Sequence, residues 1–145
     1  MTGVQTCALP ISNTNPSNIT RIFSDFDVSF SPHPITKDVV KKTGTNSVVQ
    51  ALMNLVQLNS FEKPFHPEIA SNIRKLLFEL IDPITANALA TEIKALISNF
   101  EPRVNVINVF VTGDPDNNGY NVTIEFFVVN VNSAITVSVF LERVR

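Results

Sequence analysis

The chain has 145 residues, of which 44% are hydrophobic and 17% charged, and its formal net charge is -2. This length and composition predict a folded chain with one core. The negative charge argues against a nucleic-acid binder that depends on phosphate neutralisation. No apolar run reaches the ~18 residues of a membrane span, so neither nucleic acid nor membrane is an expected partner.

The first eleven residues, MTGVQTCALPI, match the translation of a common sequencing-adapter text at every position. We therefore expect residues 1–11 to be an artefact, with the true N-terminus missing. The alternative, a short signal-like leader, lacks a basic n-region and an adequate apolar stretch. Cys7, the only cysteine, lies in this segment, so neither a disulfide nor thiolate chemistry is expected. Residues 12–20 are polar and rich in turn formers, which predicts a flexible lead-in, and residues 21–145 are expected to form a single domain.

Residues 21–30 alternate between apolar and polar side chains, which is the period of a β-strand. Asp25 and Asp27 fall on the polar side. We interpret them as the solvent-exposed side of an extended segment and not as metal ligands, because no further acids follow at the spacing of a calcium loop. His33 lies between two prolines, which predicts a rigid turn, and residues 35–46 are predicted to be a polar connection.

The first predicted helix covers residues 47–58. Ser47 and Gln50 match a capping box, and apolar residues at helical spacing follow them. A loop with two prolines is expected over residues 59–67.

Two further helices are predicted before residue 101. The second begins at Glu68 or Ser71 and runs to Leu80, with apolar residues at i, i+3, i+4 and i+7. The pair Asp82-Pro83 should end it, and Thr85 is expected to be the N-cap of a third helix that reaches about residue 100. We interpret the apolar stripes of these helices as core and not as a cofactor site.

The last third of the chain has strand periodicity. Strands are predicted over residues 104–111, 120–128 and 135–141, separated by turn-forming residues at 113–119 and 130–133. Helices followed by strands predict an α+β fold, with about three helices packed on one face of a small C-terminal antiparallel meander. An uncovered edge of so short a sheet invites pairing with another chain.

Glu101, Pro102 and Arg103 lie where the period changes from helix to strand. Pro102 disfavours the helical conformation at Glu101 and cannot donate a backbone hydrogen bond, so the helix should stop at or just before Glu101. Glu101 and Arg103 are then held on a stiff corner. There they either form a pair with each other or reach a partner; a solvated surface pair would contribute only about 0–1 kcal/mol.

No catalytic, metal or cofactor site is predicted. His33 and His66 lie beside prolines, without a cysteine or an i, i+4 partner for zinc. The four glycines form no phosphate loop. Glycosidase chemistry needs two positioned carboxylates, and Glu68, Glu79 and Asp82 qualify only by being acids. We therefore expect no enzyme activity and no small-molecule substrate.

Five short motifs occur in order along the chain: R-x-F-S-D-F-D-x-S-F at 21–30, H-P-x-T-x-D-V at 33–39, E-x-P-F-x-P at 62–67, L-L-F-E at 76–79 and F-E-P-R-V at 100–104. With them, residues 19–145 resemble the contractile-tail baseplate wedge family of bacteriophages, the gene-25 type. This family is similar to baseplate components of type VI secretion machines and other contractile injection systems. The Glu-Pro-Arg motif is the most recognisable part of the resemblance.

The resemblance implies a structural protein of the virion tail baseplate, assembled in the bacterial host cytoplasm. Its implied partners are the helical core bundle of the wedge and the tail sheath, whose assembly it would initiate. Carried over to this chain, Glu101, Pro102 and Arg103 would contact the wedge core. Val137 and Val139 would set the register of an added sheath strand. The alternatives are a secretion or injection baseplate subunit and, disfavoured by the residues above, a tail-associated lysozyme.

Two positions depart from the family pattern. Lys63 stands where the family often has arginine before Pro-Phe, and Ala70 stands where it has glycine before serine. Lysine cannot reproduce the planar two-pronged donor of arginine. We therefore expect different contacts in this loop, with the fold unchanged.

Overall fold

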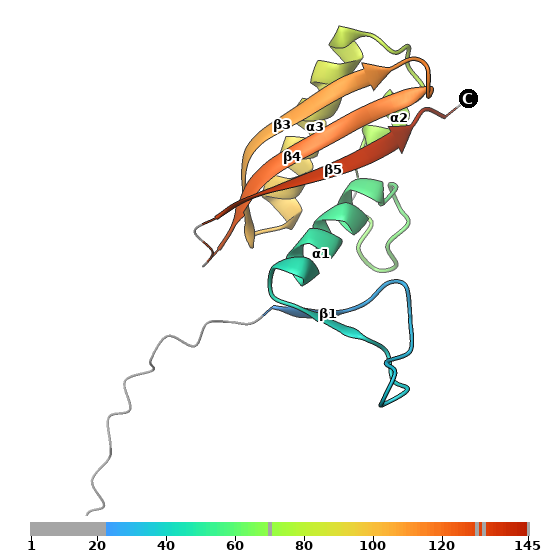
Figure 1. Ribbon diagram of the computed structural model, residues 1–145. Helices are drawn as coiled ribbons and strands as arrows, with labels where there is room; N and C mark the ends of the chain where they lie inside the picture. Colours follow the sequence, from blue (N-terminus) through green and yellow to red (C-terminus); the bar gives the residue numbers. More distant parts are fainter. Residues whose placement is uncertain (1–22, 70, 130, 132, 145) are drawn as a thin grey trace, which may run out of the picture.

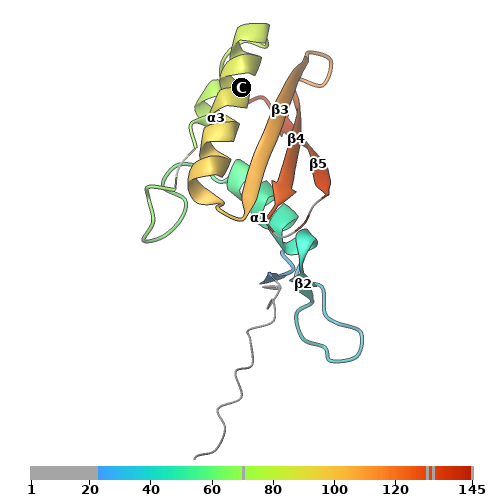
Figure 2. The same ribbon diagram turned by 90° about the vertical axis from the view of Figure 1, so that its left-hand side faces the viewer.

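The computed structural model describes residues 23–69, 71–129, 131 and 133–144. Its elements in chain order are β1 (Ser24–Phe26), β2 (Lys41–Thr43), α1 (Thr45–Gln57), α2 (Ile73–Leu76), α3 (Pro83–Phe100), β3 (Val104–Asp114), β4 (Gly119–Val128) and β5 (Ala134–Glu142). The three long strands form an antiparallel sheet in the order β3-β4-β5, and α3 lies against one face of it (Figures 1 and 2). The predicted α+β class, with a C-terminal meander, is therefore confirmed. The predictions for residues 1–11, with Cys7, and 12–20 fall outside the described residues.

Alternating side chains of β4 form the centre of the core. Tyr120, Val122, Ile124 and Phe126 are fully buried and Val128 is nearly so. Both edge strands present side chains to the same face, because the register pairs β4 in antiparallel fashion with β3 and with β5. The predicted strand periodicity of the last third is thus the pattern of one buried face.

The stripes of the first and third predicted helices close this core from the other side, as predicted, whereas Leu80 at the end of the second predicted stripe is 71% exposed, so that part of the prediction is wrong. On α1 the side chains of Val48, Leu52 and Val56 are buried, and on α3 those of Leu89 and Ile93 are fully buried. They belong to one cluster with the inner face of the sheet. Among the described residues, no helix is both long and apolar enough to cross a membrane.

The predicted capping box at the start of α1 is wrong. The helix begins at Thr45, and its N-cap is Gly44 at φ 63°. The Ser47 hydroxyl donates to the Gly44 carbonyl, while the Gln50 side-chain amide donates to the carbonyl of Phe26. Gln50 reaches another segment because β1 lies against this end of α1, a contact that spacing along the helix cannot reveal.

The boundary between the second and third helices also differs from the prediction. The second helix has only four residues, Ile73–Leu76. Asp82 is the N-cap of α3: its carboxylate accepts a hydrogen bond of 2.6 Å from the Thr85 backbone N–H, and Pro83 occupies the first turn. This bond lowers the pKa of Asp82. Asp82-Pro83 thus starts a helix, and Thr85 lies inside it.

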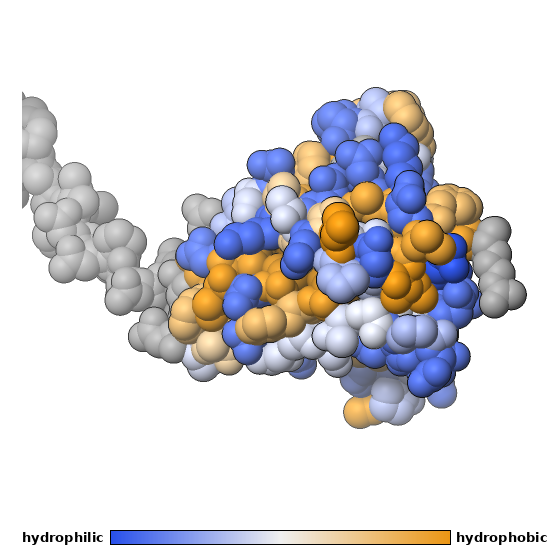
Figure 3. Space-filling model, turned by 90° about the horizontal axis from the view of Figure 1, so that it is seen from above, coloured by the Kyte–Doolittle hydropathy of each residue, from blue (hydrophilic) through white to orange (hydrophobic). Residues whose placement is uncertain are grey.

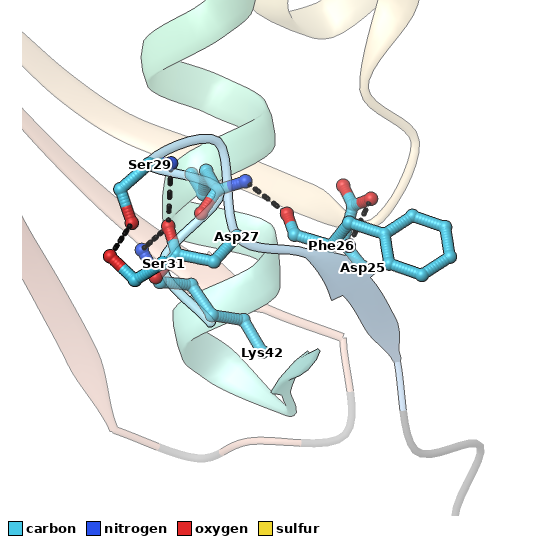
Figure 4. Close-up of polar contacts among 7 residues, drawn as sticks. Asp25, Phe26, Asp27, Ser29, Ser31 and Lys42 are labelled. Atoms are coloured by element: carbon cyan, nitrogen blue, oxygen red, sulfur yellow. Dashed lines mark hydrogen bonds and ion pairs between the residues drawn. The ribbon is translucent and has the colours of Figure 1, made fainter. Parts of the chain in front are cut away.

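The N-terminal segment folds as a short hairpin, residues 23–43, instead of one strand over residues 21–30. Only Ser24–Phe26 is a strand, and it pairs with Lys41–Thr43 inside the predicted polar connection. The chain turns at Asp27, whose carboxylate accepts the Ser29 N–H and pairs with Lys42 at 3.2 Å (Figure 4). This side-chain bond offers the backbone a turn that competes with a longer strand.

Candidate partner-binding site

The corner between α3 and β3 has the predicted geometry. The helix ends at Phe100, and Glu101 is its C-cap, with a backbone N–H that donates to the Ile97 carbonyl at 2.9 Å. Pro102 is exposed, and β3 begins at Val104. Because proline cannot continue the helix, the change of direction occurs within two residues.

Glu101 and Arg103 pair with each other across this corner. Arg103 donates from Nε to Oε1 and from Nη2 to Oε2 of Glu101, each at 2.6 Å, and its backbone N–H reaches Oε1 at 3.3 Å. The Glu101 side chain is 8% exposed and that of Arg103 is 30% exposed. The hydrogen bond to Glu101 is the main cause of a raised pKa for Arg103. The sequence left open whether Glu101 and Arg103 pair with each other or reach a partner, and in the structure they pair with each other.

A hollow of about 460 Å³ opens beside this pair. It lies between α1, the end of α3 and the loop over residues 59–69, and its walls are mainly apolar: Ala51, Asn54, Leu55, Leu58, Glu62, Lys63, Pro64, Ile69, Phe100 and Glu101. Two sequence motifs, E-x-P-F-x-P and F-E-P-R-V, therefore meet at one surface. The sequence analysis did not predict this hollow, because it depends on how α1 and α3 cross.

Val137 and Val139 lie on the inner face of β5. Val139 is 6% exposed and Val137 is half-buried, and both pack toward the core. Their side chains fix which face of β5 turns inward. What β5 leaves available along its outer side is backbone, since among the described residues it pairs only with β4.

The two edges of the sheet are not equivalent. In β3 the register shifts between Val106 and Asn108, which leaves Ile107 as an extra residue, and α3 lies against this strand. The pairing of β5 with β4 runs without interruption from Ala134 to Glu142. A bulge twists an edge away from new pairing, whereas a regular strand remains a template.

The acids and histidines considered for other chemistry have structural contacts. His66 pairs with Glu68 at 2.8 Å on the surface, which lowers the pKa of Glu68. The Asp82 carboxylate caps α3, whereas at Glu79 the backbone carbonyl, and not the carboxylate, accepts a hydrogen bond from Arg143. The His33 ring accepts two backbone N–H groups of its own turn. Within the described part of the chain, no group of three or more His, Cys, Asp or Glu could hold a metal ion.

Comparison with known proteins places the fold in a family. The family model described as baseplate wedge protein gp25 matches residues 42–133, more than half of the chain. The chain belongs to the gp25 family of baseplate wedge proteins. It is 29% identical over 114 residues to baseplate wedge protein gp25 of Enterobacteria phage T4, covering 79% of this chain and 86% of that protein. It is therefore a structural baseplate component of a contractile-tail system.

Solved structures share the fold at lower identity. A chain of the anti-feeding prophage baseplate superposes with a TM-score of 0.67 and 18% identity, covering 79% of this chain and 91% of that one. A chain of the post-contraction pyocin R2 baseplate gives 0.52 and 15%, covering 81% and 98%. A proposed tail lysozyme from Geobacter sulfurreducens gives 0.64 and 16%, covering 69% and 91%. At these identities the likeness concerns the fold alone.

Several large apolar side chains of this gp25-family chain are exposed, and the sequence analysis did not identify them as surface residues. Seen from the upper end of the molecule in Figure 1, hydrophobic residues reach the surface in patches between hydrophilic ones (Figure 3). Large exposed side chains occur in the hairpin, in the 59–69 loop, between α2 and α3, in the first turn of α3 and on the outer face of the sheet: Phe26, Val28, Phe30, Ile35, Phe61, Phe65, Phe78, Leu80, Ile84, Phe110, Phe127 and Phe140. Such surface is typical of a subunit with several neighbours.

Proposed function

We propose that this protein is a baseplate wedge subunit that connects the wedge core to the tail sheath and initiates sheath assembly. It would act in the virion tail and assemble in the cytoplasm of the bacterial host. The observation that carries the proposal is the family match over residues 42–133, which includes α1, the Glu101–Arg103 corner and the β3–β4 hairpin. The free edge of β5 supports the sheath contact.

The proposed sheath contact is the addition of a strand to β5. A neighbouring strand that pairs with Ala134–Glu142 would extend the sheet to four strands. Backbone hydrogen bonds would supply affinity, and the alternation of buried and exposed side chains on β5 would fix the register. Residues 134–141 contain neither proline nor a charged residue, so nothing in their sequence blocks an incoming strand.

The proposed wedge contact is the corner with the adjacent hollow. Pro102 is exposed, and Arg103 keeps its Nη1 group without a hydrogen bond to any described residue. Nη1 could donate to a partner acid or to carbonyl groups at a helix end. Apolar side chains of the helical core bundle would enter the hollow beside Glu101.

The second candidate is a baseplate subunit of a secretion system or another contractile injection particle. The fold that this chain shares with the anti-feeding prophage and pyocin R2 baseplate chains is compatible with this candidate. Both candidates require the same contacts. Neighbouring genes distinguish them: head and tail genes indicate a phage, and secretion genes indicate the second candidate.

We propose that the protein has no enzymatic activity. The carboxylate of Asp82 is used as a helix cap and that of Glu68 in a surface pair with His66, so neither has the raised pKa of a general acid. Incubation of the purified protein with peptidoglycan should release no fragments. Turnover that a single Glu68→Gln or Glu79→Gln substitution abolishes would overturn this part of the proposal.

Proline substitution tests the sheath contact, with sheath protein from the same gene cluster as the binding partner. Neighbouring residues in an antiparallel strand direct their N–H groups to opposite sides, so we compare Thr136→Pro with Val137→Pro. Proline at the position whose N–H faces β4 interrupts the pairing with β4 and should lower the unfolding midpoint. Proline at the position whose N–H faces away from β4 removes a donor from the free edge; this variant should keep the fold but lose sheath binding. Full sheath binding by the well-folded variant would contradict the proposed contact.

A further inference from the structure

Arg103 touches the N-terminal hairpin as well as Glu101. Its guanidinium carbon lies 5.4 Å from the centre of the Phe23 ring, within the range of a cation–π contact. Phe23 is half-buried, packs against the core and directly precedes β1. The charge of Asp25, also in the hairpin, contributes to the raised pKa of Arg103. The corner of α3 and β3 therefore meets the base of the hairpin.

The hairpin has few other attachments to the body of the protein. The Phe23 carbonyl accepts the Gly44 N–H at 2.6 Å, and the Phe26 carbonyl accepts the Gln50 side-chain amide at 2.7 Å. Gln50 is nine-tenths buried, and its Oε1 has no partner among the described residues. An unpaired buried acceptor is costly. The hydrogen bond from the Gln50 amide group to the Phe26 carbonyl is the contact that offsets this cost.

The side chains of the hairpin add little core to hold it in place. Phe26, Val28, Phe30 and Ile35 are 68%, 54%, 72% and 85% exposed. Within the hairpin, Asp27 and Lys42 stabilise the turn and not the junction with the body (Figure 4). Apart from Phe23 at its base, apolar burial does little to fix the orientation of this hairpin, so the contacts at the base must do so.

We propose that Glu101 and Arg103 form an internal clamp that fixes the hairpin against the corner of α3 and β3. Glu101 holds the guanidinium plane through two hydrogen bonds. The guanidinium is thereby held over the Phe23 ring, with its carbon 5.4 Å from the ring centre. Arg103 is a positioning residue in this account, and the exposed apolar side chains of the hairpin are what it positions.

The clamp changes how a loss of wedge binding in Arg103 variants is understood. Such a loss can arise because Nη1 no longer reaches a partner, or because the hairpin moves. The clamp itself does not depend on the proposed function, since all its atoms belong to one chain. It can therefore be tested without wedge or sheath proteins, and its failure would leave the proposed function standing.

Native-state hydrogen exchange of the isolated full chain tests the clamp. The Asp27 and Gly44 amides report on the hairpin and its base, because they donate to the carbonyls of Val40 and Phe23. Amides of β4 report on global unfolding. In Arg103→Ala we expect the hairpin amides to exchange about two- to fivefold faster after normalisation to β4, the fold-change of an exposed cation–π contact. A merely global loss of stability would speed exchange of the β4 amides and would not raise this ratio.

Three further variants complete the test. Phe23→Leu keeps an apolar side chain but removes the aromatic face, and it should raise the ratio as Arg103→Ala does. The double variant should add little to either single change. Arg143→Ala is the matched control, because Arg143 donates to Glu79 and not to the hairpin. Should Arg103→Ala fail to fold, Phe23→Leu decides alone. An unchanged ratio in the folded variants, or fully additive effects of the two changes, would overturn the clamp.

Discussion

The sheet and the N-terminal hairpin carry the same sequence pattern and use it differently. Alternate residues of β4, from Tyr120 to Val128, are at most 3% exposed. Alternate residues of the hairpin, Phe26, Val28 and Phe30, are more than half exposed. The difference is the layer of helices, which covers β4, whereas of these helices the hairpin meets only the start of α1, at its base (Figure 2). Alternation therefore predicts a buried face only where another element lies over it.

Removing one aromatic ring from each region should give the largest contrast. Phe126→Ala empties a fully buried site and should cost about 3–5 kcal/mol of unfolding free energy. Phe26→Ala removes a ring that is 68% exposed and should change the unfolding free energy by no more than about 0.5 kcal/mol. Urea unfolding followed by circular dichroism measures both. Similar losses in the two variants would mean that the hairpin contributes to the core.

A single methyl group at Gly119 should show how tightly the sheet is packed. A Cβ at this position would lie 2.5 Å from Cζ of Phe140 and 2.6 Å from the backbone oxygen of Leu141. The backbone of β5 cannot move aside easily, so Gly119→Ala should destabilise the protein by about 1–3 kcal/mol. Gly119→Ala combined with Phe140→Ala relieves only the contact with the ring. The double variant should recover little, and full recovery would show that the backbone contact is unimportant.

Asp82 makes the stability of the helix-and-sheet body depend on pH. The hydrogen bond from the Thr85 N–H is the main cause of the lowered pKa of Asp82 in the folded protein. The ionised carboxylate therefore stabilises the fold at pH values above the unfolded pKa of about 3.9. This stabilisation is lost as the pH falls through the lower pKa of the folded state. Asp82→Ala should lower the thermal midpoint at neutral pH, and the difference from wild type should shrink below about pH 4. Asp82→Asn, which keeps a capping oxygen, should retain most of the stability. A pH-independent difference between wild type and Asp82→Ala would argue against the cap.

Asp27 should give the smallest effect, confined to the hairpin. Its pKa is lowered first by the Ser29 N–H and then by Lys42, so the sign of the pH dependence is the same as for Asp82. Asp27→Ala should speed hydrogen exchange in the hairpin and leave the thermal midpoint unchanged, because the hairpin adds little to the core. A lowered midpoint would show that hairpin and body unfold together.

Local rules predicted the body of the fold well. The stripes of α1 and α3 and the alternation of the strands each describe an element with one buried side, and Pro102 marks the end of α3 by its own chemistry. The predictions are wrong where the same residue type can take either of two structural roles. Asp82-Pro83 can end one helix or begin the next, and Gln50 can cap its own helix or reach β1. Only the packed structure decides between such uses.

The candidate site was predictable in part for the same reason. The corner at Glu101, Pro102 and Arg103 follows from the change of period, and the internal pair was one of two stated options. The hollow beside Glu101 and the Phe23 contact join segments that are far apart in sequence. No spacing along the chain encodes them.

Hydrogen exchange along β5, with and without sheath protein from the same gene cluster, tests the central claim most directly. In the free protein, amides that face β4 should be protected and their neighbours on the free edge should exchange rapidly. Addition of the sheath protein should slow the free-edge amides of Ala134–Glu142 and leave the outer edge of β3 unchanged. Sheath binding that leaves the β5 amides unprotected, or that protects β3 instead, would contradict the account.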